Sequence, residues 1–133
     1  MRQSLALSLC STLALSSFAM AQTTELTGAD ITTLVSGNTL YLELPGGGPR
    51  GKGPAAIYYS ADNKVAAKFP SGQTPKGTWS IKGNSICVVW EDMPTNPCTG
   101  YRKTGDKIDV INLETGQSRG PLTKTAPGNP DKL

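Results

Sequence analysis

Two residues, Gly83 and Asn84, separate two segments in which apolar side chains alternate with other side chains. Gly-Asn is a favoured two-residue loop of β-hairpins, and a loop of that length fixes the register of the strands it connects. The predicted hairpin joins residues 78–82 to residues 85–90. Three residue pairs are expected to face each other: Lys82 with Ser85, Ile81 with Ile86, and Trp79 with Val88. The apolar pairs then share one face, so the turn and the hydrophobic pattern predict the same structure.

The same alternation recurs along the chain, with turn residues at intervals of about 8–12 residues. Further strands are expected over residues 40–44, 57–59, 65–69, 101–103, 108–111 and 117–122. Short strands at regular spacing predict an antiparallel meander, which forms either a small barrel or a curved sheet. The residues expected to face inward are Leu42, Leu44, Ile57, Tyr59, Val65, Ala67, Phe69, Trp79, Ile81, Ile86, Val88, Trp90, Ile108 and Val110.

One short helix is expected ahead of the strands. Thr27 is a favoured N-cap residue, Asp30 completes a capping box, and Gly37 suits the C-terminal end of the helix. The sparse apolar stripe consists of Leu26, Ile31, Leu34 and Val35. A helix of two to three turns needs a packing partner. The expected fold class is therefore mainly β (α+β), with one short N-terminal helix packed on the meander.

Residues 1–21 have the layout of a secretory signal peptide, with Arg2, an apolar stretch rich in serine and threonine, and a cleavage site after Ala21. The stretch is short and weakly apolar for a membrane anchor. We expect no transmembrane segment after cleavage, and a periplasmic or secreted bacterial protein. The expected organisation is a single β-rich domain over residues 22–122 and a flexible C-terminal tail over residues 123–133, which has two prolines and no apolar period.

Cleavage would leave two cysteines, Cys87 and Cys98. An even number of cysteines in an exported chain favours a disulfide bond. The alternative, a redox or metal site, lacks both the C-x-x-C spacing and a histidine partner.

The chain has no histidine, which excludes Ser-His-Asp and Cys-His catalysis and histidine-ligated zinc or haem. Its few carboxylates show no calcium-loop spacing and no pairing typical of glycosidases. We expect no enzymatic activity, no metal site and no cofactor. The formal net charge of +3, without a basic run, gives no support for nucleic-acid binding.

The glycine-rich stretch 45–54 matches parts of two nucleotide-binding motifs. Both motifs need a helix directly after the loop, whereas Pro54 leads into a predicted strand. The stretch is therefore interpreted as a loop between strands. Arg50 and Lys52, held among glycines, are candidates for contact with an anionic group or an acidic protein surface.

Aromatic residues supply the other candidate binding residues. Tyr58 and Tyr59 are neighbours on a strand, so they point to opposite sides of the sheet, and Tyr41 is expected to face outward. An exposed aromatic surface favours a binding module that engages a protein partner of the cell envelope. The alternative is a carrier whose small apolar ligand lies inside a barrel lined by Tyr59, Trp79 and Trp90.

An expected N-terminal helix, a Gly-Thr-Trp strand and two cysteines are found within residues 26–30, 36–40, 58–59, 77–79, 86–90 and 98–101. In these features most of the chain after residue 21 resembles small exported bacterial proteins that form a domain of unknown function. The resemblance implies a periplasmic location in a Gram-negative bacterium and no particular activity. Gly77-Thr78-Trp79 is also similar to the G-x-W motif of lipocalins, where the motif lies on the first barrel strand, whereas three strands are expected before it here.

Overall fold

The computed structural model describes residues 14–17, 22–94 and 98–133. The predicted signal-peptide cleavage site, and most of the signal peptide itself, lie outside the described residues. The elements are β1 (Thr23–Glu25), α1 (Gly28–Val35), β2 (Asn38–Pro45), β3 (Lys52–Tyr59), β4 (Lys64–Lys68), β5 (Lys76–Lys82), β6 (Ser85–Trp90), β7 (Thr99–Thr104), β8 (Lys107–Asn112) and β9 (Ser118–Pro127).

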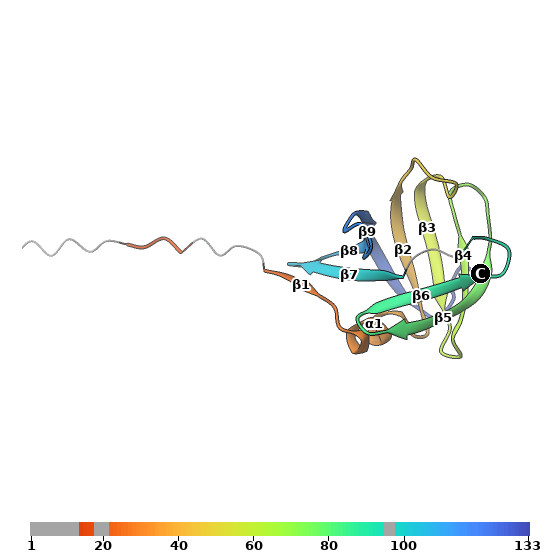
Figure 1. Ribbon diagram of the computed structural model, residues 1–133, viewed down its shortest axis with the longest axis horizontal. Helices are drawn as coiled ribbons and strands as arrows, with labels where there is room; N and C mark the ends of the chain where they lie inside the picture. The colour runs from red at the N-terminus through yellow and green to blue at the C-terminus, as the bar shows by residue number, and fades with distance from the viewer. Residues whose placement is uncertain (1–13, 18–21, 95–97) are drawn as a thin grey trace, which may run out of the picture.

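Strands β2 to β9 form a closed antiparallel barrel of eight strands (Figure 1). Each strand pairs with the next one along the chain, and β9 returns to pair with β2. Closure removes the unpaired edges that an open sheet would expose. The sequence predicted either a barrel or a curved sheet, and the structure is a barrel. Strand β1, which the sequence did not predict, pairs with the far end of β7.

The predicted hairpin is confirmed as β5 and β6, with the register expected from its two-residue loop. All fourteen residues expected to face inward belong to the hydrophobic core or pack against it. The Gly77–Trp79 segment lies on β5, so strands β2, β3 and β4 precede it in the barrel.

Helix α1 closes one end of the barrel, next to the β5–β6 turn (Figure 1). Thr27 and Asp30 form the predicted capping box, and Ile31 and Val35 are fully buried. The Gly28 amide donates a hydrogen bond of 3.0 Å to Asn84 Oδ1. A Cβ atom at Gly28 would overlap the Gly83 carbonyl, so a glycine is required for the helix to approach the turn this closely.

The chain end differs from the prediction of a domain that stops at residue 122. Strand β9 continues to Pro127, and the Gly128 amide donates to the Gly37 carbonyl at 2.8 Å. Farther on, the Tyr41 hydroxyl donates to Asp131 at 2.8 Å. Backbone pairing with β2 holds this segment while most of its side chains remain exposed. It therefore carries no apolar period, which is why the hydrophobic pattern did not reveal it.

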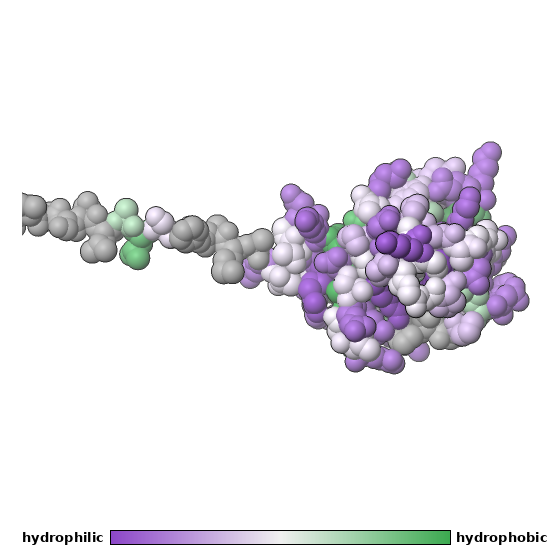
Figure 2. All heavy atoms as spheres, turned by 90° about the horizontal axis from the view of Figure 1, so that it is seen from above, coloured by the Kyte–Doolittle hydropathy of each residue, from purple (hydrophilic) through white to green (hydrophobic). Residues whose placement is uncertain are grey.

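The face of the molecule in Figure 2 is covered mainly by hydrophilic residues, and hydrophobic residues show only in small separate areas. In the part of the chain that the structure describes, no helix has the length and apolar character needed to cross a membrane.

Candidate functional site

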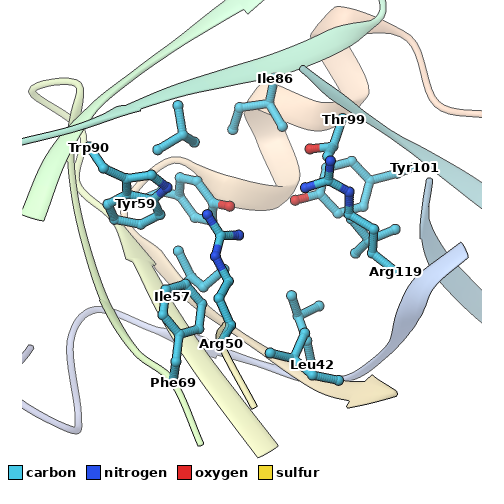
Figure 3. Close-up of a pocket in the computed structure, with 13 residues that line it drawn as sticks. Leu42, Arg50, Ile57, Tyr59, Phe69, Ile86, Trp90, Thr99, Tyr101 and Arg119 are labelled. Carbon is cyan, nitrogen blue, oxygen red and sulfur yellow. The ribbon is translucent and has the colours of Figure 1, made fainter. Parts of the chain in front are cut away.

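The barrel contains a cavity of about 60 Å³ between its strands (Figure 3). Its wall is mostly aliphatic and aromatic and is interrupted by a few polar groups. The lining residues are Leu42, Leu44, Arg50, Ile57, Tyr59, Phe69, Ile86, Val88, Trp90, Thr99, Tyr101, Val110 and Arg119. Helix α1 closes the barrel end at the β5–β6 turn, so the cavity is reached from the opposite end, where the β2–β3 loop lies (Figure 1).

Arg50 reaches the cavity from the glycine-rich loop between β2 and β3. Its carbonyl accepts a hydrogen bond of 3.1 Å from the Ser71 amide, which ties this loop to the β4–β5 loop. Gly51 has a φ of +86°, and a Cβ atom there would lie 2.9 Å from the Ser71 nitrogen. A glycine at this position therefore lets the loop turn back over the barrel opening. The Arg50 guanidinium carbon lies 4.7 Å from the ring centre of Phe69 and 5.8 Å from that of Trp90.

Arg119 enters the cavity from the start of β9 through a break in the strand register. Val110 pairs with Gly120, whereas the next residue, Ile111, pairs with Ser118. Arg119 is thus the additional residue of a β-bulge, a feature that redirects a side chain. Gly120 follows with a φ of +120°, and a Cβ atom there would overlap the carbonyl of a β2 residue.

The cavity is electropositive. Burial lowers the pKa of both the Arg50 and Arg119 guanidinium groups, and the charge of Arg119 lowers the pKa of Arg50 further. Arginine has so high an intrinsic pKa that both groups remain charged at neutral pH. Aspartate and glutamate are absent from the described lining residues. Within the described part of the chain, no carboxylate lies at ion-pairing distance from Arg119. The charge of Glu114, in the β8–β9 loop, raises the pKa of Arg119.

The two tryptophans differ in how their indole N–H groups are satisfied. Trp79 Nε1 donates to the Ser60 carbonyl at 3.0 Å. Trp90 is 5% exposed, yet its Nε1 has no hydrogen-bond partner in the described structure. Figure 3 shows this nitrogen on the side of the ring that faces the cavity. A buried donor without a partner costs about 1–3 kcal/mol, so an acceptor brought into the cavity by a ligand would recover that free energy.

Two tyrosines add hydroxyl groups to the cavity wall. Tyr59 and Tyr101 are buried, and their hydroxyl groups are near enough to influence each other's pKa. Burial raises the pKa of Tyr59 to about 12 and that of Tyr101 well above the usual value. Both phenols are therefore neutral at physiological pH, and each hydroxyl group can donate or accept a hydrogen bond.

The predicted binding residues do not gather in one place. Arg50, Tyr59 and Trp90 line the cavity, and the remaining four do not. Trp79 is buried beside Tyr59, with the ring centres 6.1 Å apart. The other three lie on the outside: Lys52 and Tyr41 border one hollow, and Tyr58 borders another.

The sequence suggested that Arg50 and Lys52 contact an anion together. In the structure Arg50 lines the cavity, whereas Lys52 lies at a hollow on the outside of the barrel. Sequence reasoning also missed Thr99, Tyr101 and Arg119 as lining residues. For Arg119 the only available signal was the glycine that follows it, a residue type that often accompanies a bulge.

The predicted disulfide bond joins Cys87 on β6 to Cys98 just before β7, with 4.3 Å between the Cα atoms. Ile86 and Thr99 are the residue pair that links these two strands in the barrel ladder. The disulfide therefore reinforces the seam between β6 and β7, the two strands from which Trp90 and Tyr101 reach the cavity.

No protein-family model matches this chain, and no curated protein or solved structure is significantly similar to it.

Proposed function

We propose that this protein is an exported, non-enzymatic binding protein that holds a small ligand inside its barrel. The observation that carries the proposal is the cavity with the unpartnered N–H group of Trp90. Eight-stranded barrels are just wide enough to be filled by side chains or to hold one small ligand. A cavity with apolar walls and a few converging polar groups is typical of small-molecule sites.

Export is supported by the signal-peptide pattern of residues 1–21 and by the disulfide bond, because such bonds persist in oxidising compartments such as the bacterial periplasm. We therefore place the protein in the periplasm as part of the proposal.

The protein-partner hypothesis has less support from the geometry. It relied on Tyr41 and Tyr58 as aromatic residues on the outside of the sheet, and both are only partly exposed. Tyr41 is covered in part by the chain end, since its hydroxyl binds Asp131 and its ring lies 4.4 Å from Lys124 Nζ. An envelope partner remains an outcome that the experiment below can reveal.

The proposal is tested by following tryptophan fluorescence while small acids, amides, alcohols and aromatic compounds are added to the mature protein. A saturable change is expected, because Trp90 lines the cavity and Trp79 lies beside the cavity residue Tyr59. A flat response to every compound would contradict the proposal. Native mass spectrometry of protein purified from its own cells should reveal an additional small mass, whereas a larger assembly without it would favour a protein partner.

A matched pair of variants separates the cavity from the outer surface. Val110→Phe fills the cavity and should abolish the fluorescence change. Val89→Phe makes the same substitution on the outer face of β6, where Val89 is 55% exposed, and should leave the fluorescence change intact. Equal behaviour of the two variants would place the ligand outside the barrel.

A further inference from the structure

Three side chains of the cavity wall carry hydrogen-bond donors and no acceptor atom. The guanidinium groups of Arg50 and Arg119 and the indole of Trp90 offer N–H donors only. In Figure 3 the guanidinium groups of Arg50 and Arg119 both lie in the cavity wall and point inward. A ligand that complements this arrangement has to supply acceptor oxygens and negative charge.

We propose that the ligand is a small organic carboxylate, with its carboxylate group between the guanidinium groups of Arg50 and Arg119 and an oxygen directed toward Trp90 Nε1. This inference rests on the proposed function and names the class of ligand. Guanidinium and carboxylate groups form short charge-assisted hydrogen bonds, frequently as bidentate pairs. A bound anion would offset the cost of holding two cationic groups partly buried in one cavity.

The rest of the ligand has to be apolar and small. Leu42, Ile57 and Val110 form an aliphatic part of the wall, which would be left in contact with water around an inorganic anion. One water molecule needs about 10–15 Å³ of such space, so a cavity of about 60 Å³ has room for only a few. An acid with a short aliphatic body or a single ring matches this volume.

An entry route adjoins the cavity. A surface hollow of about 330 Å³ lies under the glycine-rich loop and shares Leu44, Arg50 and Arg119 with the cavity. The two arginines thus stand at the boundary between the hollow and the barrel interior, where they meet an incoming anion first. Their charge also raises the rate at which an anion reaches the opening.

The test compares acids with their neutral amides of nearly the same shape by calorimetric titration of the mature protein. The probes are butanoate with butanamide and benzoate with benzamide, and inorganic phosphate serves as an anion without an apolar body. The acids are expected to bind at least about tenfold more tightly than the amides. Equal binding of acid and amide would overturn this inference and leave the proposed function standing. Phosphate binding as tight as that of the acids would also overturn it, and a complete absence of binding would overturn both proposals.

Two variants with the same change in charge locate the site. Arg119→Gln should weaken acid binding at least about tenfold while amide binding stays the same. Lys52→Gln removes a positive charge from the outside of the barrel and should leave both unchanged. An equal loss in the two variants would show an effect of net charge alone and would overturn the proposed position of the carboxylate between Arg50 and Arg119. Arg119→Lys keeps the charge but loses the planar fork, so it should bind acids with intermediate affinity and serves as a second variant if Arg119→Gln does not fold.

Discussion

Removal of the Cys87–Cys98 disulfide, by the double substitution to alanine, tests how the barrel seam between β6 and β7 is held. The cysteines are 11 residues apart, and in the chain-entropy model a loop of this length contributes about 3 kcal/mol to the free energy of unfolding. Small domains have net stabilities of only about 5–15 kcal/mol, so the loss is a substantial share. For a domain of this size it corresponds to a fall of about 12 °C in Tm.

The assay is thermal unfolding followed by circular dichroism, with the oxidised protein, the double variant and the reduced protein compared at one pH. The reduced protein and the double variant should unfold at nearly the same temperature, because both lack only the covalent link. A double variant whose Tm lies within about 2 °C of the oxidised protein would refute the reasoning, since the link would then add almost nothing to the seam.

The disulfide also bears on the cavity. Ile86–Thr99 is the pair that joins β6 to β7, and Trp90 and Tyr101 project from these two strands. Loss of the link should therefore weaken ligand binding well below the melting temperature, measured by the same calorimetric titration. Unchanged affinity in the double variant would show that the remaining barrel holds the cavity without the link.

Three further predictions follow from local geometry. Thr27→Ala removes the side chain that caps α1 and should lower the free energy of unfolding by about 1 kcal/mol in urea titration, whereas Thr27→Ser should not. Gly77→Ala places a Cβ atom against the Val89 carbonyl and should lower the free energy of unfolding by about 1–3 kcal/mol or more, measured as a lower Tm. An unchanged Tm would contradict this crowding. Burial raises the pKa of Tyr59 to about 12 and that of Tyr101 well above the usual 10, so the folded state holds these protons more tightly than the unfolded chain. Their contribution to the free energy of unfolding, about 3 kcal/mol for Tyr59, is complete below pH 10 and is lost as the pH rises toward 12. Tyrosinate absorbance and unfolding curves can follow this loss. Normal titration of all four tyrosines would contradict it.

Much of the fold follows from patterns within short stretches of the chain. The Gly83–Asn84 loop set the register of its hairpin, and the capping box of Thr27 and Asp30 placed the start of α1. Such signals are readable because turn geometry, helix capping and strand alternation depend on residues only a few positions apart.

The candidate site was only partly predictable. Arg50, Tyr59 and Trp90 were named from the sequence, but so was Lys52, which the structure places outside the barrel. Strict alternation along β9 does not predict that Arg119 points inward, because a bulge changes the register at that residue.

By itself, the sequence determined the mainly β class, the hairpin, the helix cap and the pairing of two cysteines that a cleaved chain would retain. Only the tertiary structure decided that the sheet closes, that Arg50 and Arg119 line the same cavity, and that the Trp90 N–H lacks a partner in the described structure. The reason lies in the separation along the chain. Closure places Leu40 of β2 opposite Thr125 of β9. The backbone hydrogen bonds that hold two strands together are the same for every residue type except proline, so they leave little trace in the side chains.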